Sequence, residues 1–287
     1  MVRIYHTLWT SPMTRQMVQA QMLCFAISSW YARKNGAHIV LHTDMLGANM
    51  LQACPYNEIY LTLRNTPLNP NIAPFWAAGK LLATATEPVG SVHIDGDVFI
   101  KEGKILETIE QSEADLFTQN EEGEKWRVDD TYSLSQKCIG QDLTPTGLHI
   151  DYALSYNCGV TRFRNKQLKQ DYINTYFNTV NDAVSDKQFM DRYHRMTLDE
   201  SRKGSIIPDI VVEQQFLHEI ATRGNYKVDC LLHGDIEKYA DEMGYVHFLS
   251  ARKYRSIPEL KKHLEYLSPQ LYQAITTNPI FLANDPK

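Results

Sequence analysis

The sequence lacks the features that mark several common protein classes. Its five cysteines are odd in number and include no C-x-x-C pair, which favours reduced thiols over a disulfide framework or a zinc knuckle. The longest apolar run, MLCFAISSWYA at 22–32, is too short and too interrupted by serine to cross a bilayer, so it predicts a core helix. The N-terminus has no basic-then-apolar signal-peptide order. Together these absences predict a cytoplasmic protein with no transmembrane segment.

An excess of positive charge is also missing. The chain has 29 Lys and Arg against 34 Asp and Glu, a net charge of -5, which gives no general attraction to nucleic acid or to anionic lipid. It contains no internal repeat, low-complexity tract or Gly/Ser-rich linker. With 287 residues, 43% of them hydrophobic, it can bury one large core. We therefore predict a single domain over 1–287, with elaborations near the C-terminus and an oligomeric state that the sequence leaves open.

The N-terminal third alternates strand-like and helix-like patterns. Strands are predicted from alternating or continuous apolar runs, and helices from longer amphipathic stretches, the first beginning at Ser11-Pro12. The predicted strands are 3–9, 37–44, 57–63 and 89–95, and the predicted helices are 11–33 and 73–87. This βαβ order predicts an α/β fold in which a mainly parallel sheet has helices on both faces.

Beyond residue 101 the pattern is less regular. The segment 121–150 is polar and turn-rich, and 150–163 has the pattern of strand, turn and strand. Elsewhere a strand is expected at 114–121, helices at 164–200, 205–224 and 257–267, and short strands or loops at 227–235 and 244–250.

Two aspartates, Asp95 and Asp97, follow the strand predicted at 89–95 and precede a second apolar run. In open α/β sheets, ligands bind beyond the carboxyl ends of the strands. Two like charges in such a place repel, and burying them unpaired costs several kcal/mol. A divalent cation compensates directly, and carboxylate oxygens suit Mg²⁺ or Mn²⁺, which also bridge to diphosphate oxygens. The alternative is a solvated acidic turn in which Gly96 supplies the backbone freedom.

Four stretches, in this order along the chain, resemble the motifs of GT-A-fold glycosyltransferases: the Asp-Gly-Asp motif, SYNCGV at 155–160, VVEQQFL at 211–217 and HFLSARKY at 247–254. The resemblance implies a Rossmann-like GT-A fold. It also implies transfer of a sugar from a nucleotide-diphosphate donor, commonly a UDP-sugar, with Mn²⁺ or Mg²⁺ held by Asp95 and Asp97.

The second and third stretches suggest residues near the sugars. SYNCGV resembles the Asn-x-Gly-Val segment that this family places beside donor and acceptor, which implies such positions for Asn157 and Gly159. VVEQQFL resembles a helix start whose carboxylate lies near the reacting centre, and Glu213 and Gln214 match it. Plainer interpretations stay open, because Glu213 can be an acid that stabilises a helix N-terminus and 157–160 can be a turn between strands.

The fourth stretch resembles the C-terminal segment of the glycogenin-like retaining family. The resemblance implies His247 as the third metal ligand and Lys253 as a diphosphate contact. Two positions depart from that segment, since Ser250 stands where glycine is usual and Tyr254 where proline is usual. A lone histidine is more often a bystander than a ligand.

Three further residues are expected to contact the nucleotide-sugar. Lys80 stands where the family often has a basic residue that contacts the donor. Tyr5 and Thr7, in the first predicted strand, are expected to hold the base and ribose. On this interpretation 1–100 forms the nucleotide-binding half, and 101–287 forms the acceptor-binding half together with the C-terminal elements.

The chemistry that follows from the resemblance is sugar transfer to a glycan or lipid-linked acceptor, as in polysaccharide biosynthesis. Glu213 would be the base of an inverting enzyme, whereas in a retaining enzyme the leaving phosphate would take the proton. Two other functions remain open. A haloacid-dehalogenase-like phosphatase would use Asp95 as nucleophile and Asp97 as general acid, although Phe99 replaces the usual Thr or Val. A non-catalytic protein could use the same fold to bind a nucleotide or sugar.

Overall fold

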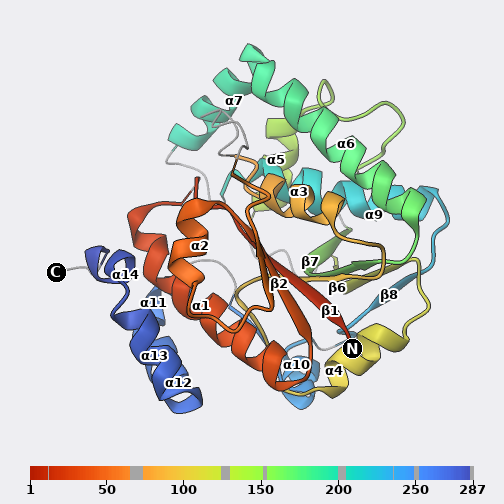
Figure 1. Ribbon diagram of the computed structural model, residues 1–287. Helices are drawn as coiled ribbons and strands as arrows, with labels where there is room; N and C mark the ends of the chain where they lie inside the picture. The colour runs from red at the N-terminus through yellow and green to blue at the C-terminus, as the bar shows by residue number, and fades with distance from the viewer. Residues whose placement is uncertain are drawn as a thin grey trace.

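Seven strands form the central sheet of the protein, as seen in a computed structural model that describes residues 1–11, 13–64, 74–123, 130–150, 154–199, 205–234, 236–248 and 252–284 (Figure 1). The strands are β1 (Arg3–Leu8), β2 (His38–Thr43), β3 (Glu58–Tyr60), β4 (Val92–Ile94), β6 (Leu116–Glu122), β7 (Ser155–Phe163) and β8 (Val228–Cys230). Their order is β3-β2-β1-β4-β7-β6-β8. Neighbouring strands are parallel except where β7 pairs with β4 and β6. The predicted α/β fold with a mainly parallel sheet is therefore confirmed.

Helices cover both faces of this sheet (Figure 1). They are α1 (Arg15–Lys34), α2 (Met45–Leu51), α3 (Ala78–Thr86), α4 (Lys104–Gln111), α5 (Thr131–Ile139), α6 (Lys166–Ser185), α7 (Lys187–Leu198), α8 (Pro208–Ile210), the π-helical turn η3 (Val211–Gln215), α9 (Phe216–Arg223), α10 (Ile236–Met243), α11 (Arg252–Arg255), α12 (Ile257–Leu267), α13 (Pro269–Thr276) and α14 (Pro279–Ala283). Helix α3 packs on β1, and α6 and α9 pack on β7, whereas α1 packs on β2 from the other side.

The C-terminal helices extend the α1 side of the molecule (Figure 1). Helices α12, α13 and α14 all pack on α1. Leu264, Ile275 and Phe281 from these helices are buried in one apolar cluster with residues of α1 such as Met22. Each fully buried side chain of this kind contributes about 1.5–3 kcal/mol relative to an exposed one. The predicted C-terminal elaborations are thus a helical layer built onto the sheet domain.

A second, two-stranded sheet connects distant parts of the chain. β5 (Val98–Ile100) pairs antiparallel with β9 (Tyr245–His247), so that Val98 lies opposite His247. The three residues of β5 are all buried, which explains the second apolar run after the aspartates. This pairing brings the segment that follows β9 next to the Asp-Gly-Asp motif.

Several local predictions were wrong. The first helix begins at Arg15 rather than at Ser11, and Pro12 lies outside the described residues. The pattern at 150–163 predicted a turn between two strands, but 155–163 is the single strand β7. All nine residues of β7 are buried, and hydrogen bonds to β4 and β6 on its two sides carry the strand through the glycine. The polar, turn-rich segment 121–150 contains the helix α5, and 236–243, for which no element was predicted, forms the helix α10.

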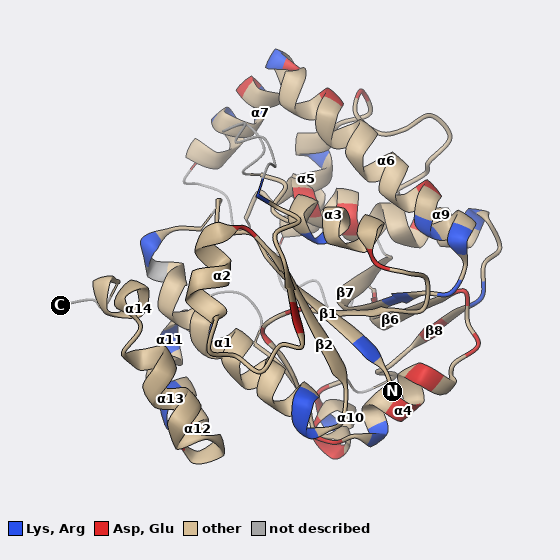
Figure 2. Ribbon diagram, viewed as in Figure 1, with Lys and Arg blue, Asp and Glu red and all other residues tan. Residues whose placement is uncertain are grey.

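The structure also shows the state of the cysteines and the distribution of surface charge. All five cysteines are free thiols, as predicted. Among the described residues, no helix combines the length and the apolar character needed to span a membrane. Figure 2 shows acidic and basic residues interspersed along α4, α7 and α9.

Candidate functional site

A cavity of about 520 Å³ lies beyond the carboxyl ends of β1 and β4. Every candidate catalytic, binding or metal-ligating residue named from the sequence lines it, with the exception of Tyr5. These lining residues are Thr7, Lys80, Asp95, Asp97, Asn157, Gly159, Glu213, Gln214, His247 and Lys253. The structure therefore gathers residues from both ends of the chain into one chamber, whose volume is in the range of small-molecule sites.

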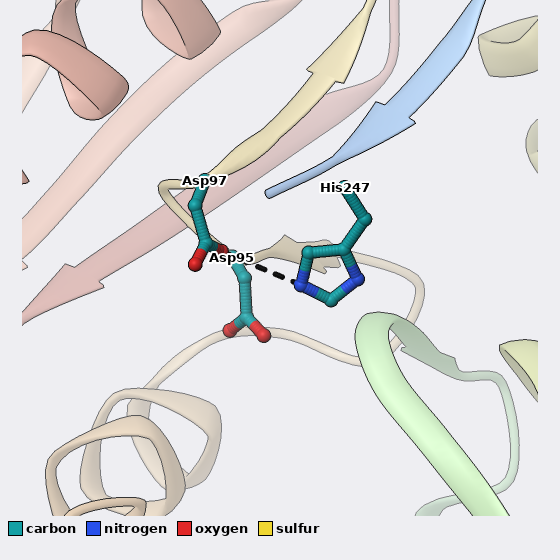
Figure 3. A group of neighbouring side chains, drawn as sticks. All are labelled: Asp95, Asp97 and His247. Carbon is teal, nitrogen blue, oxygen red and sulfur yellow. Dashed lines mark ion pairs between the residues drawn. The ribbon is translucent and has the colours of Figure 1, made fainter. Parts of the chain in front are cut away.

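The backbone around β4, β5 and β9 positions three potential metal ligands. The Asp95 amide donates to the Gly159 carbonyl at 2.9 Å, and the Val98 amide donates to the Asp95 carbonyl at 3.0 Å, so the chain turns tightly between β4 and β5. The Phe248 amide donates to the Asp97 carbonyl at 2.9 Å. As a result Asp95, Asp97 and His247 face one another across the motif (Figure 3).

The geometry of these three side chains suits a divalent cation. One ligand atom from each of Asp95, Asp97 and His247 lies within 4.8 Å of the other two. Ligand bonds to such ions are about 2.1 Å long, so these three atoms would need only small movements to hold one ion together. His247 Nε2 lies 3.5 Å from Asp97 Oδ1, the contact dashed in Figure 3. Two carboxylates and one imidazole form a donor set that Mn²⁺ and Mg²⁺ accept.

Two lysines already neutralise the aspartates. Lys80 Nζ lies 2.9 Å from Asp95 Oδ1 and 2.7 Å from Glu213 Oε1, and Lys253 Nζ lies 2.5 Å from Asp97 Oδ2. Burial lowers the pKa of Lys80, but the carboxylates of Asp95 and Glu213 outweigh it and raise that pKa well above its usual value. Burial likewise opposes the charge of Lys253, and Asp97 raises its pKa. Both lysines are therefore positively charged. Their charges compensate those of Asp95 and Asp97, which lie close together at the end of β4.

The protonation of Asp97 follows from the same contacts. Burial acts to raise its pKa, but the Lys253 ammonium, 2.5 Å from Asp97 Oδ2, holds that pKa well below the usual range. Asp97 is consequently an ionised carboxylate at neutral pH, which is the form that binds a metal ion.

Glu213 and Gln214 reach the cavity from η3. Such π-helical turns occur frequently at functional sites. Glu213 is 5% exposed, and burial raises its pKa while Lys80 opposes that change. The Gln214 side-chain amide lies 2.7 Å from the hydroxyl of Tyr132. These contacts hold an acidic and an amide side chain side by side on one wall.

The residues of β7 meet the cavity from another side. Asn157 Nδ2 donates to Glu122 Oε1 at 2.7 Å, and Asn157 Oδ1 accepts from the Gly159 amide at 3.0 Å. A Cβ at Gly159 would overlap the Gln119 side chain and come within 2.7 Å of His247 Cε1. Glycine is therefore required here so that the histidine can lie against the strand.

Of the two residues of β1 that were predicted to contact the nucleotide, one lines the cavity and the other does not. Thr7 lines the cavity near its strand end. Tyr5 is 2% exposed, and its hydroxyl donates to Thr84 Oγ1 at 3.0 Å. The structure thus does not bring Tyr5 to the cavity, because Tyr5 lies further from the carboxyl end of β1 than Thr7 and its side chain is buried. Ser250, one of the departures from the family segment, lies outside the described residues.

Sequence reasoning missed several residues of the site. Gln119 contacts His247, and Tyr245 donates its hydroxyl to Gln119. The signal for Gln119 was a polar residue within a buried strand. Phe25 packs so closely on Gly96 that a Cβ at that position would overlap its ring. Trp76 and Tyr254 also line the cavity, and nothing in their spacing along the sequence indicated this.

The protein thus has an α/β fold. Its cavity lies beyond the carboxyl ends of two parallel strands and contains a candidate site for a divalent cation. Residues 2–278 match the model of DUF6734, a family of unknown function, and the chain belongs to that family. No curated protein matches the sequence significantly. Among solved structures, the chain is similar to the crystal structure of galactosyltransferase LgtC in complex with donor and acceptor sugar analogues. That likeness covers 97% of this chain and 98% of the other at 12% identity, with a TM-score of 0.42, values too low to bear on function.

Proposed function

We propose that this protein is a metal-dependent glycosyltransferase that moves a sugar from a nucleotide-diphosphate donor, a UDP-sugar, to a glycan or lipid-linked acceptor. The observation that carries the proposal is the convergence of Asp95, Asp97 and His247 with Lys80 and Lys253 in one cavity. A diphosphate is a compact dianion with many oxygen acceptors, and lysines together with a divalent cation complement it. The motif order that resembles the GT-A family supports the same conclusion.

The residues of the cavity then take distinct roles. Asp95, Asp97 and His247 would hold Mn²⁺ or Mg²⁺, which supplies charge that offsets the departing nucleoside diphosphate. Lys80 and Lys253 bind the diphosphate oxygens.

The remaining site residues bind the nucleotide and the sugars. Thr7 contacts the nucleotide, Gly159 leaves room for the donor sugar, and Asn157, Glu213 and Gln214 orient the donor sugar and the acceptor hydroxyl. In this account 1–100 supplies the nucleotide-binding half, and 101–287 supplies the acceptor-binding half.

We further propose that transfer retains the anomeric configuration, because the segment from His247 to Lys253 resembles the retaining glycogenin-like family. In that case the leaving phosphate accepts the proton of the acceptor hydroxyl, and Glu213 orients the sugar. If transfer inverts the configuration, Glu213 is the base. Nuclear magnetic resonance of the product distinguishes the two mechanisms, since only the retaining mechanism gives a product with the anomeric configuration of the donor.

The test is hydrolysis of a panel of UDP-sugars, measured as release of UDP with Mn²⁺ and with EDTA. We expect release that requires the metal and is lost in an Asp95→Ala/Asp97→Ala variant. The matched control is Asp182→Ala/Asp191→Ala, which removes two exposed carboxylates on α6 and α7 and should leave release unchanged. Release of inorganic phosphate from phosphate monoesters, with none of UDP, would instead indicate the phosphatase alternative.

A further inference from the structure

Gln119, on β6, contacts the face of His247 that is turned away from the aspartates. Its side-chain oxygen Oε1 lies 2.8 Å from His247 Nδ1 and also accepts the hydroxyl of Tyr245 at 2.5 Å. Its Nε2 donates to Asn120 Oδ1 at 3.0 Å. Because a carbonyl oxygen only accepts, the proton of a neutral imidazole belongs on Nδ1. That tautomer leaves the lone pair of Nε2 facing Asp97.

The surroundings hold this arrangement in place. Gln119 is 4% exposed and Tyr245 is 2% exposed, so water does not compete freely for the amide oxygen. Residues from β6, β7 and β9 converge here, and the absence of a side chain on Gly159 provides the space that Gln119 and His247 occupy. Lone glutamines in a buried strand are costly unless their polar atoms are bonded, and here both ends of the amide have partners.

We propose that Gln119 is a positioning residue that fixes the tautomer and ring orientation of His247 and so sets the affinity of the site for a divalent cation. A histidine ligand commonly donates its second N–H to an acceptor, which orients the ring and increases its basicity. The inference rests on the proposed metal-dependent function. It goes beyond it by giving a role to a residue that does not itself contact the ion or the substrate.

The first test measures the tautomer without any metal. In protein labelled with ¹⁵N-histidine at pH 8, two-bond ¹H–¹⁵N correlation spectra distinguish the two neutral tautomers, and a His247→Gln variant assigns the signal. We expect the Nδ1–H form in the native protein and its loss as the dominant form in Gln119→Met, which keeps the side-chain length but has no oxygen. A dominant Nε2–H form in the native protein would overturn the proposal.

The second test measures Mn²⁺ affinity from the electron paramagnetic resonance signal of the free ion. We expect Gln119→Met to weaken binding about 10- to 100-fold and Gln119→Glu, which keeps an acceptor, to bind at least as tightly as the native protein. The control is Gln136→Met, which alters another buried glutamine, on α5 and outside the cavity, and should change neither the tautomer nor the affinity.

Unchanged Mn²⁺ affinity in Gln119→Met would refute the proposal. If the native protein binds no Mn²⁺, the proposed function fails, and the part of the present inference that concerns the metal fails with it. In that case the tautomer spectra still decide whether Gln119 orients His247. The two failures are therefore distinguishable.

Discussion

Replacing Lys80 with methionine removes the cation that separates Asp95 from Glu213. The Lys80 ammonium lies 2.9 Å from one carboxylate and 2.7 Å from the other. Each contact has a gross attraction of about 6 kcal/mol at an effective dielectric constant of ~20, much of which is spent on desolvation. Breaking a buried ion pair by removing one partner costs about 3–5 kcal/mol.

The destabilisation expected for Lys80→Met lies near the lower end of this range of about 3–5 kcal/mol, because one of the two partners of Lys80 is partly exposed. The side chains of Lys80 and Glu213 are 16% and 6% exposed, but that of Asp95 is 28% exposed, and solvent screens its charge. We expect a loss of about 3 kcal/mol in the free energy of unfolding. That loss corresponds to a fall of about 5 °C in Tm for a chain of 287 residues.

Mn²⁺ should partly reverse the effect of this substitution. In the native protein a bound ion competes with Lys80 for Asp95, whereas in Lys80→Met the ion meets an unpaired carboxylate. Since a ligand that binds the folded state stabilises it, saturating Mn²⁺ should raise Tm by more in the variant than in the native protein. Thermal unfolding followed by circular dichroism, with Mn²⁺ and with EDTA, measures both increments.

Lys187→Met is the matched control for this prediction. Lys187 pairs with Asp191 on the surface of α7, where their side chains are 86% and 62% exposed. Because solvent screens such a pair, its loss should leave stability and the response to Mn²⁺ essentially unchanged. The reasoning would be refuted if Lys80→Met were as stable as the native protein in EDTA, or if Mn²⁺ raised both values of Tm equally.

Two further predictions concern a buried histidine and a close backbone approach. Burial lowers the pKa of His6 to about 3, below the value of ~6.5 in an unfolded chain. Its contribution to stability is therefore present above pH ~6.5 and is lost as the pH falls toward 3, by about 2 kcal/mol at pH 5. Denaturant unfolding at pH 7 and pH 5 should show a smaller difference for His6→Gln than for the native protein or for His194→Gln, which alters an exposed residue. In Gly159→Ala, the added methyl group displaces the histidine of the metal cluster, and Mn²⁺ affinity should fall about 10-fold or more. Gly103→Ala, where a Cβ meets only ordinary contacts, should bind Mn²⁺ normally; equal affinity in both variants would contradict the geometry.

The predictable part of the fold is local. Apolar alternation and length identified β1, β2 and β4 and the helices α1 and α3, because those patterns depend on neighbouring residues. The short helix α2 was not predicted. The path of 155–163 was not predictable in this way. Whether a strand continues through Asn157 and Gly159 depends on the hydrogen bonds offered by β4 and β6, which lie far away in the sequence.

Candidate site residues could be predicted where a short motif contains the chemical groups itself. They could not be predicted where the alignment of distant strands decides which side chains meet. Asp95 and Asp97 were recognised from two like charges after a strand. The contacts of Gln119 with His247 and Tyr245 depend on how β6, β7 and β9 are aligned, which spacing along the chain does not reveal. Tyr5 lies outside the cavity, whereas Thr7, two residues nearer the carboxyl end of β1, lines it, and the apolar alternation of a strand does not indicate which of its residues reaches a site.

The central claim is that the cavity binds a nucleoside diphosphate together with a divalent cation, and calorimetric titration with UDP tests it most directly. The account predicts binding with Mn²⁺, little or none with EDTA, and none for Asp95→Ala/Asp97→Ala. Binding of GDP in place of UDP under the same dependence would change the nucleotide and keep the class of enzyme. Binding of neither nucleotide, or binding that is indifferent to both the metal and the aspartates, would contradict the account.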